Sequence, residues 1–459
     1  MLIDGILKNT EAYKRDNKKS ERKQKGQFFT SEKSAQYMAR ASATIAYADS
    51  LHILDPGAGN GMLGASVLKY CIDQQLCRVI HITFVETDIT IIPLLSETAR
   101  SMQAYASERG ITCSCRIVQE NFLTSYLPDE KYDIVICNPP YKKIRKDSPE
   151  SKAMSDYVFG QPNLYSLFMV KGLNLLRDNG RFVYITPRSW TSGEYYKRSR
   201  EYLLNNMNIT SILLFRDRDN AYSSEEVLQE TMITVAEKSG TQNENISLLQ
   251  TVNDSFSDTT VLNIPARDIK DIGPDHYLLL PMNMDEVRVI QKMASIGDTF
   301  NSLGYEFKTG PVVEFRNKDA LSLTREINTV PMYRSANISD KGLVFPADLS
   351  KPQYVSSGEK KLLIRNGNTI FLRRLAAKEE TRRLQSCVYY KQGQDKYISV
   401  ENHVNYLTRK DDKPLTKKEV EWINSVLMSE DYDIYYRVLN GSTQVNAGEL
   451  NNLPLQRRA

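Results

Sequence analysis

The pattern of apolar residues between about residue 50 and residue 238 constrains the fold most, because short apolar runs alternate there with longer amphipathic stretches. We expect strands at Leu51–Leu54, Ile80–Glu86, Cys113–Val118, Tyr132–Cys137, Arg181–Thr186, Ile209–Phe215 and Thr231–Glu237. We expect helices between them at Met62–Leu76, Ile91–Ser107, Leu164–Leu176 and Glu194–Asn206. This alternation predicts an α/β fold with a doubly wound, mostly parallel Rossmann-like sheet, whose ligands bind outside the carboxyl ends of the strands.

The length and a change in composition predict two domains. The chain has 459 residues, well above the roughly 100–200 residues of a typical domain. Residues 238–260 are rich in Ser, Thr, Asn and Gln, which indicates a linker or an exposed loop. Beyond them the regular alternation stops, although Lys418–Leu427 has the spacing of a helix. We therefore expect one domain over residues 1–240 and a second, mixed α/β domain over residues 241–459.

Composition excludes several classes of protein. Apolar residues make up 41% of the chain and charged residues 25%, which is typical of a globular protein that stays in solution. The chain has no run of eighteen consecutive apolar residues and no apolar signal core at its N-terminus, so we expect neither a membrane partner nor secretion but a cytoplasmic location. The six cysteines show no zinc spacing with each other or with histidine, so we expect reduced thiols and no metal site.

The net charge of +4 is unevenly distributed. Residues 14–25 contain seven Lys or Arg against two Asp or Glu, and residues 360–383 contain eight against two. Such runs are most often solvated faces of a protein, and a groove for a polyanion is the less common explanation. Charge alone therefore does not identify a partner.

A glycine-rich loop follows the first predicted strand. Asp55–Gly61 reads DPGAGNG and leads directly into a predicted helix. Alternating glycines permit a tight turn and let backbone N–H groups approach a ligand beside a helix N-terminus. The spacing lacks the last glycine of the dinucleotide fingerprint, which disfavours a nicotinamide enzyme. Glu86 ends the next strand, where a carboxylate can accept hydrogen bonds from both ribose hydroxyls. The loop and Glu86 together predict a nucleoside-containing cofactor.

A second motif follows the predicted strand Tyr132–Cys137. Asn138-Pro139-Pro140-Tyr141 has two consecutive prolines, which fix φ and remove two N–H donors. The Asn side-chain oxygen and a Pro carbonyl can accept both hydrogens of one amino group, and this favours a nitrogen lone pair that can attack a methyl sulfonium. Tyr141 can stack on the planar group that carries the amine. The motif therefore predicts transfer of a methyl group to a conjugated amine or amide.

These motifs carry a family resemblance. DPGAGNG followed by NPPY resembles the S-adenosylmethionine-dependent amino-methyltransferases, and GQFFTSEKSAQYMA at 26–39 is similar to the motif that opens gamma-class DNA adenine methyltransferases. In that class the cofactor motifs precede the catalytic motif, and a target-recognition domain closes the chain. Segments 371–383, 397–407 and 440–455 resemble the recognition domains of type II restriction-modification adenine methylases.

The resemblance implies a site-specific methyltransferase that transfers a methyl group from S-adenosyl-L-methionine to the N6 amine of an adenine. The adenine would be flipped out of double-stranded DNA, because a stacked base cannot reach the end of a sheet. The enzyme would be the modification enzyme of a restriction-modification system, with a separate cognate restriction endonuclease as a possible partner. Residues 1–240 would form the catalytic domain, and residues 241–459 the target-recognition domain.

The resemblance also implies roles for single residues around the cofactor. Thr30 would lie near its methionine carboxylate, Glu86 would hold its ribose, and Asn138 would contact it as well. The methionine end would be surrounded by Asp55, Gly57, Ala58 and Gly59. Asn121 and Phe122 occupy the place of an Asp-Phe pair whose Asp usually contacts the cofactor adenine amine, and Asn can still accept through its oxygen. Phe168 would close the adenine pocket.

Two further sets of residues would contact the DNA. Tyr222, in the segment DNAYSSEEVLQETMITVAE, matches an aromatic residue that packs against the flipped base, so Tyr141 and Tyr222 would hold the base between them. With DNA as the expected partner, the basic stretch 360–383 becomes a candidate DNA surface. Its candidate contacts are Arg373, Arg374, Lys378, Arg382 and Arg383, which can bind either a guanine edge or a phosphate.

Four alternatives remain. Protein-glutamine methyltransferases also use an NPPY loop, but they lack a C-terminal domain of this size, and an RNA-base methyltransferase is disfavoured for a similar reason. A catalytically idle DNA-binding specificity subunit need not keep the glycine loop, Glu86 and the NPPY motif together. The N4 amine of cytosine poses similar chemistry, although Asn138 as the first motif residue favours adenine by the family resemblance.

Overall fold

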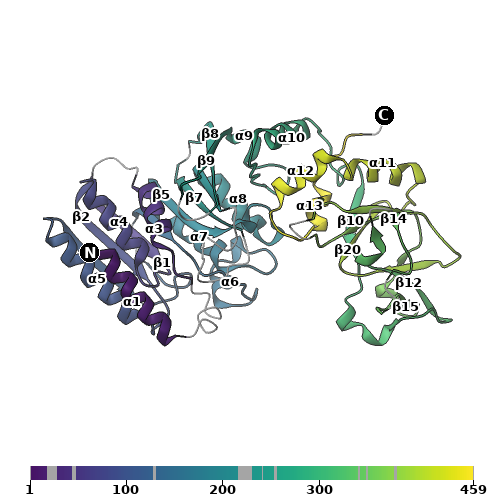
Figure 1. Cartoon of the computed structure of the whole chain (residues 1–459), viewed down its shortest axis with the longest axis horizontal. Coiled ribbons are helices and arrows are strands. Elements are labelled where there is room, and N and C mark those ends of the chain that lie inside the picture. The colour runs from purple at the N-terminus through teal and green to yellow at the C-terminus, as the bar shows by residue number, and fades with distance from the viewer. Residues whose placement is uncertain are drawn as a thin grey trace. The chain divides into compact units, whose positions relative to one another are not determined.

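The protein consists of two compact units, Met1–Met282 and Asn283–Ala459. The computed structural model describes residues 2–17, 28–43, 48–127, 131–215, 230–239, 241–252, 256–339, 342–347, 350–376 and 380–457. Figure 1 shows the elements of both units along the chain. Each unit is considered by itself below.

The described strands of the first unit form a nine-stranded sheet with the order β3-β2-β1-β4-β5-β7-β6-β8-β9. The strands are β1 (Ala48–Pro56), β2 (Cys77–Val85), β3 (Thr112–Val118), β4 (Tyr132–Cys137), β5 (Leu176–Pro187), β6 (Asn208–Phe215), β7 (Thr231–Glu237), β8 (Asn245–Thr251) and β9 (Thr260–Pro265). The first five strands are parallel, and β7 runs antiparallel between β5 and β6. The fold is therefore the predicted α/β fold with a mostly parallel sheet.

The strand order reverses at the centre of this sheet. The chain moves outward from β1 through β2 to β3, then returns to place β4 on the other side of β1. In doubly wound sheets such a switch point leaves a crevice between the carboxyl ends of the two central strands. The glycine loop follows β1 and the NPPY motif follows β4, so the topology brings the two motifs together.

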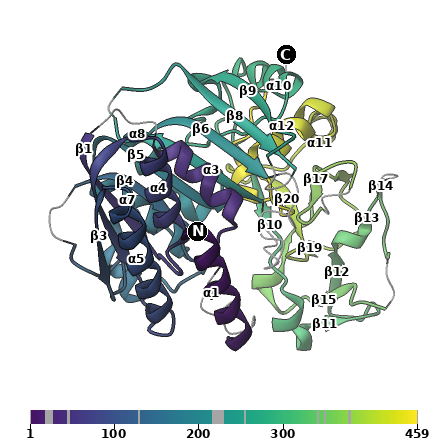
Figure 2. The same cartoon turned by 60° about the vertical axis from the view of Figure 1, so that its left-hand side comes forward.

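Helices cover both faces of this sheet because alternate side chains of each strand point to opposite faces. Ile134 and Ile136 of β4 belong to a core that also contains buried residues of α1, α3, α4 and α5. Val135 faces the other way, where a Cβ on Gly172 of α7 would come within 3.2 Å of it. In both views α4 and α5 lie side by side on one face of the sheet (Figures 1 and 2).

The described helices of the first unit are α1 (Leu2–Asp16), α3 (Glu32–Ser42), α4 (Met62–Asp73), α5 (Ile92–Ser107), α6 (Pro149–Ala153), α7 (Leu164–Leu175), α8 (Lys197–Asn206) and α9 (Ala266–Ile269). Short 3-10 helices in the part of this unit that the structure describes are η1 (Ser155–Tyr157), η2 (Arg188–Thr191) and η3 (Glu194–Tyr196). Most residues of α4 are buried, and a Cβ at Gly64 would lie 2.5 Å from the Phe84 ring. This helix therefore packs against β2 more closely than a larger residue would permit.

The boundary between the units lies about forty residues beyond the position predicted from composition. The polar segment after residue 240 contains β8, which pairs in parallel with β6 and buries Ile246 and Leu248. β9 pairs with β8 and completes the sheet. Residues 241–282 thus belong to the first unit, because short apolar runs within this polar segment extend the sheet.

The second unit is a mixed α/β assembly, as predicted. Its described strands form a four-stranded sheet (β10-β20-β17-β18), a five-stranded sheet (β11-β15-β12-β19-β16) and the pair β13-β14. Their bounds are β10 (Tyr305–Thr309), β11 (Leu321–Ser322), β12 (Thr329–Tyr333), β13 (Ile338–Ser339), β14 (Gly342–Leu343), β15 (Tyr354–Ser356), β16 (Ile364–Arg365), β17 (Thr369–Arg373), β18 (Ser386–Tyr389), β19 (Tyr397–Val400) and β20 (Val404–Arg409).

The helices of the second unit are α10 (Met284–Ala294), α11 (Lys417–Leu427), α12 (Glu430–Leu439) and α13 (Ala447–Asn451), with the 3-10 turns η4 (Glu314–Arg316), η5 (Lys318–Ala320), η6 (Ser335–Asn337) and η7 (Lys360–Leu362). The predicted helix near residue 418 is confirmed as α11, which begins with a capping box between Thr416 and Glu419. Tyr333, Phe371 and Tyr389 pack ring to ring in the core of this unit. No helix among the described residues is long and apolar enough to cross a membrane.

Candidate active site at the carboxyl ends of the central strands

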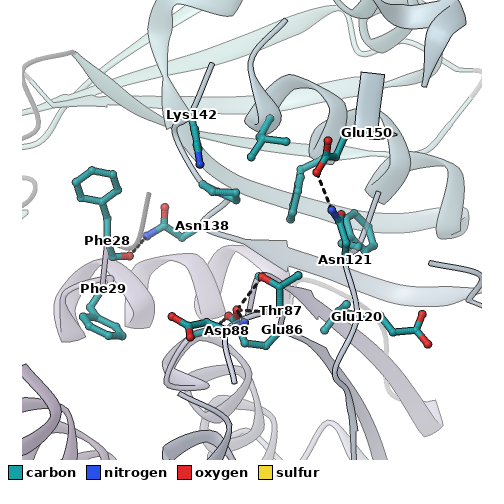
Figure 3. A pocket seen from close by; sticks show the side chains of 17 residues that line it. Phe28, Phe29, Glu86, Thr87, Asp88, Glu120, Asn121, Asn138, Lys142 and Glu150 are labelled. Carbon is teal, nitrogen blue, oxygen red and sulfur yellow. Dashed lines mark hydrogen bonds between the residues drawn. The ribbon is translucent and has the colours of Figure 1, made fainter. Parts of the chain in front are cut away.

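A cavity of about 410 Å³ opens at the carboxyl ends of β1 to β4 (Figure 3). Its lining comes from segments that follow these strands, together with the segment before α3 and parts of α6 and α7. The lining residues are Phe28, Phe29, Gly57, Gly59, Val85, Glu86, Thr87, Asp88, Glu120, Asn121, Phe122, Asn138, Pro140, Lys142, Glu150, Leu164 and Phe168. The cavity thus lies where ligands of doubly wound sheets bind.

The glycine loop after β1 wraps tightly against the end of β2. Gly57, Gly59 and Gly61 have φ values of 72°, 54° and 77°, a region that L side chains rarely adopt. The backbone N–H groups of Gly57 and Ala58 both donate to the Val85 carbonyl, at 2.7 and 3.1 Å. A Cβ at Gly57 would also lie 3.4 Å from the Phe168 ring. Glycine is therefore required here both for the turn and for the narrow space beside the cavity.

Glu86 lines the cavity, and its carboxylate forms hydrogen bonds with the loops after both β1 and β2. Its Oε2 accepts from the Gly59 N–H at 2.8 Å, and its Oε1 accepts from the N–H groups of Thr87 and Asp88 at 2.8 and 2.9 Å. A carboxylate has about four lone-pair positions, and the Thr87 hydroxyl also lies 3.5 Å from Oε1, so the acceptor capacity that remains for a hydroxyl group in the cavity is on Oε2.

Asp55 lies behind the loop and does not line the cavity. It is 1% exposed, and its Oδ2 accepts from the N–H of Gly64 in α4 at 3.1 Å. Its Oδ1 has no hydrogen-bond partner in the described part of the chain. Burial raises the pKa of the Asp55 carboxyl well above its usual range. Asp55 thus joins the loop to α4, and Ala58, which also does not line the cavity, belongs to the loop through its backbone.

The Asn138 side chain is held from two directions. Its Nδ2 donates to the Phe28 carbonyl at 2.8 Å and to Thr30 Oγ1 at 3.0 Å. The Tyr141 hydroxyl lies 3.0 Å from both Asn138 Oδ1 and the Ile185 carbonyl, and its single proton can serve only one of them at a time. Thr30 is 8% exposed and does not line the cavity. Its contact in this site is with the amide of the NPPY motif.

Phe28 is a site residue that the sequence analysis did not single out. Its ring stacks on Tyr141 with centroids 5.5 Å apart and planes inclined by 24°. Phe28 and Phe29 lie beside Asn138 in Figure 3. The only sequence signal was the pair of aromatic residues before Thr30 in a segment similar to a family motif. Pro140 lines the cavity, whereas Pro139 is buried beneath it.

The other end of the cavity is aromatic and polar. The rings of Phe122 and Phe168 lie 4.9 Å apart at 51°, and both side chains are nearly buried. Asn121 Nδ2 donates to Glu150 Oε1 at 2.9 Å, and Asn121 Oδ1 accepts from the Leu123 N–H at 3.0 Å. Figure 3 shows Asn121 and Glu150 on the side of the cavity opposite Phe28 and Asn138. Glu150 was not predicted from the sequence.

This set of groups fits a nucleoside-type cofactor. Apolar rings at one end can enclose a base, the Glu86 carboxylate can accept from sugar hydroxyls, and the glycine loop lets a ligand approach the backbone. The described residues contain no group of three or more His, Cys, Asp or Glu side chains that could hold a metal ion.

Some of the basic residues predicted to bind DNA form hydrogen bonds inside the second unit instead. Arg383 is 3% exposed, and its Nη1 donates to the Ala376 carbonyl at 2.9 Å. Its backbone N–H donates to Asp433 at 2.7 Å, so the prediction that Arg383 contacts DNA is corrected to a role in the interior of this unit. A run of charges in sequence does not distinguish exposed side chains from buried ones.

The other predicted arginines are half-buried and bonded to protein carbonyls. Arg373 Nη2 donates to the Ile338 carbonyl at 2.6 Å, Arg374 Nη1 to the Asn402 carbonyl at 3.2 Å, and Arg382 Nη2 to the Ser429 carbonyl at 3.0 Å. Lys378 and Tyr222 lie outside the described residues. Among the described basic side chains of this stretch, Lys360, Lys361 and Arg365 are exposed.

Comparison with known proteins identifies the family. The chain is 31% identical over 452 residues to the type II methyltransferase M.BsuBI of Bacillus subtilis, which covers 94% of this chain and 88% of that protein. The chain belongs to the type II restriction-modification methyltransferases. The type II methyltransferase M.PstI of Providencia stuartii is 28% identical, covering 93% of this methyltransferase and 86% of that protein. Residues 94–221 match the family described as Eco57I restriction-modification methylase.

Solved structures agree with this fold. A nuclease-deletion mutant of the type ISP restriction-modification enzyme LlaGI covers 90% of this methyltransferase and 52% of that chain, with a TM-score of 0.53 at 11% identity. Family membership confirms the predicted methyltransferase activity, the restriction-modification class and S-adenosylmethionine as the cofactor.

Proposed function

We propose that this methyltransferase modifies the N6 amine of an adenine flipped out of duplex DNA, with Asn138 and Pro139 as its catalytic acceptors. The orientation of the Asn138 amide carries this proposal. Both hydrogens of the amide nitrogen have partners in Phe28 and Thr30, so the oxygen faces the opposite way. It lies 3.0 Å from the Tyr141 hydroxyl and can accept an amine hydrogen with its second lone pair. Such a fixed acceptor at the end of a parallel strand suits an incoming amino group better than it suits an acid or a hydroxyl.

The cavity supports a definite direction for the bound cofactor. Its adenine would lie against the rings of Phe122 and Phe168, which contact each other, its ribose would be held by Glu86, and its methionine end would meet Gly57 and Gly59. S-adenosylmethionine supplies, when bound, an electrophilic methyl group on a sulfonium. The opposite positions of Asn121 and Asn138 in Figure 3 support this direction, because the methyl group must reach the NPPY motif.

The chemistry requires orientation more than a general base. Asn138 Oδ1 and the Pro139 carbonyl would accept the two amine hydrogens, which makes the nitrogen more tetrahedral and directs its lone pair at the methyl carbon. The nitrogen–carbon bond forms as the carbon–sulfur bond breaks. The methylated amine then carries a positive charge, and its extra proton can leave to water. Tyr141 would stack on the base that carries the amine.

Stacking of the base on the face of Tyr141 that Phe28 now covers would require Phe28 to move. The rings of Phe28 and Tyr141 are 5.5 Å apart, whereas a planar base between two rings needs about 7 Å, twice an atomic contact of roughly 3.5 Å. Stacking on this face of Tyr141 therefore displaces Phe28 or opens the gap. We propose that Tyr222 is the second aromatic residue that packs against the flipped base.

Exposed lysines beside the NPPY motif support DNA as the substrate. Lys142, Lys143 and Lys146 follow the motif directly and are exposed, and Lys142 lines the cavity. We propose that they contact phosphates near the flipped nucleotide. In the second unit, Lys360, Lys361 and Arg365 are better candidates for phosphate contacts than Arg383. A separate restriction endonuclease would cut the same sequence when it is unmodified.

The variant Asn138→Ala tests the mechanism. It should lose methyl transfer while the folded protein still binds DNA and the cofactor, because it removes one acceptor and no charge. Asn206→Ala, on α8 and outside the cavity lining, is the matched control and should keep full activity. Methyl transfer at the wild-type rate by folded Asn138→Ala would rule out the proposed mechanism.

A further inference from the structure

We propose that Glu150 recognises the exocyclic amine of the cofactor's adenine, a task that the family resemblance assigns to an Asp at the position of Asn121. This inference rests on the proposed role of the cavity as the S-adenosylmethionine site. Glu150 lines the cavity at its aromatic end, and Asn121 Nδ2 donates to Glu150 Oε1 at 2.9 Å. The carboxylate therefore sits beside the rings expected to enclose the base.

Asn121 is poorly suited to bind the amine by itself. Its side-chain oxygen has two lone pairs, and one of them already accepts from the Leu123 N–H at 3.0 Å. Its nitrogen is a donor, and a donor placed against the hydrogens of an adenine amine is unfavourable. The observed hydrogen bond turns this nitrogen toward Glu150 instead, so Asn121 positions the carboxylate rather than replacing it.

Glu150 has more remaining acceptor capacity than Asn121. An ionised carboxylate offers about four lone-pair positions, and the hydrogen bond from Asn121 occupies only one of them. The local backbone is also fixed, because Ser148 Oγ accepts from the Ser151 N–H at 3.2 Å and Ser151 Oγ donates to the Arg145 carbonyl at 2.8 Å. A hydrogen bond from the amine to this carboxylate would be charge-assisted and strong.

The other carboxylates of the cavity are less suitable. Glu86 already holds three backbone N–H groups at the middle of the cavity. Glu120 also lines the cavity, but Figure 3 shows its carboxylate turned away from Asn121 and Glu150. Glu120 is therefore a matched control, because its replacement removes the same charge from the same lining.

A pair of ligands that differ at position 6 of the purine, together with the N1 proton that accompanies a 6-carbonyl, separates these roles. S-adenosylhomocysteine carries a donor amine there, whereas S-inosylhomocysteine carries a carbonyl that accepts and would face the Glu150 carboxylate. Glu150 should therefore make the protein prefer the adenosyl ligand. Glu150→Gln offers an amide that can accept from the amine or donate to the carbonyl, so it should remove most of this preference.

The test is calorimetric titration of both ligands into the full-length wild type, Glu150→Gln, Glu120→Gln and the double variant Asn121→Asp/Glu150→Gln, without DNA. The ratio of the two dissociation constants should fall about tenfold in Glu150→Gln, equivalent to about 1.4 kcal/mol. It should stay unchanged in Glu120→Gln. The double variant returns a carboxylate to position 121 and should recover much of the ratio.

Two results would overturn the assignment of Glu150. One is a Glu150→Gln protein that binds both ligands with the wild-type ratio, and the other is an equal loss of preference in Glu120→Gln. Failure of the wild type to bind S-adenosylhomocysteine would instead overturn the proposed cofactor site, and with it the role of Glu150. Because the titration contains no DNA, its outcome is independent of which base is methylated.

Discussion

The contact between Thr30 and Asn138 leads to a prediction that separates two roles for Thr30. The family resemblance assigns Thr30 to the methionine carboxylate of the cofactor. The structure instead has Thr30 Oγ1 accepting from Asn138 Nδ2 at 3.0 Å, with Thr30 8% exposed. Thr30→Val keeps the shape of the side chain and removes this acceptor.

The size of the effect follows from the two hydrogen bonds of the Asn138 amide. The bond to the Phe28 carbonyl at 2.8 Å remains, while the loss of the other typically costs about 0.5–1.5 kcal/mol. An Asn138 side chain that is free to turn presents its oxygen less often to the amine. Since a factor of ten in rate corresponds to about 1.4 kcal/mol, we expect the rate constant of methyl transfer to fall roughly tenfold.

Single-turnover kinetics with a saturating cofactor measures this rate constant, and titration with S-adenosylmethionine measures cofactor affinity. Thr30→Val should slow transfer and leave the affinity for the cofactor within about twofold of the wild type, well below the tenfold that 1.4 kcal/mol represents. Thr30→Ser keeps the hydroxyl and should behave as the wild type. A tenfold weaker affinity with an unchanged transfer rate would refute the positioning role.

Three further perturbations have defined outcomes. Glu86→Ala removes the acceptor of three backbone N–H groups and should lower the free energy of unfolding by about 2 kcal/mol or more, measured by urea denaturation, and weaken cofactor binding. Burial raises the pKa of the Asp55 carboxyl, so the folded protein binds the carboxyl proton more tightly than the unfolded chain does. This difference adds to the free energy of unfolding at low pH, and the added free energy is lost as pH rises from the unfolded-state pKa toward the folded-state pKa. Asp55→Asn should therefore gain stability relative to the wild type as pH increases from about 4, and a constant difference would contradict the raised pKa. Replacing Lys143 and Lys146 by Gln should raise the dissociation constant for DNA. A plot of the logarithm of this constant against the logarithm of the salt concentration should have a slope that is smaller by up to about 2. Arg78→Gln, at the amino end of β2, should change neither the constant nor the slope.

The sheet could be predicted because its strands carry strong local patterns. Each strand expected between residues 51 and 237 is present, although several bounds differ by a few residues. β8 and β9 were missed because their apolar residues are few and lie within a polar segment. α1 and α3 were not predicted, because residues before 50 carry charges that obscure a narrow apolar face.

The central groups of the site could also be predicted, because they follow strands directly. The glycine loop, Glu86 and Asn138 meet at the switch point of the sheet, which the alternation of strands and helices had indicated. The contacts that orient these groups could not be predicted in the same way. Phe28 and Asn138 are 110 positions apart, and Asn121 and Glu150 are 29 apart, so only the folded chain brings them together.

Arg383 shows the limit of charge patterns. The run 360–383 reads as a basic surface, but its arginines differ in burial because several of them bind backbone carbonyls. Composition records the number of charges and cannot show which guanidinium groups complete the hydrogen bonds of the interior. The exposed lysines after the NPPY motif carry no distinctive pattern, and their position became evident only beside the cavity.

The most direct test of the central claim is the identity of the methylated base. The protein would be incubated with duplex DNA and S-adenosylmethionine labelled in its methyl group, and the DNA would then be digested and its nucleosides separated. We predict that the label appears in N6-methyladenine, and that Asn138→Ala yields none. Label in N4-methylcytosine, or in protein or RNA with none in adenine, would contradict the proposed function.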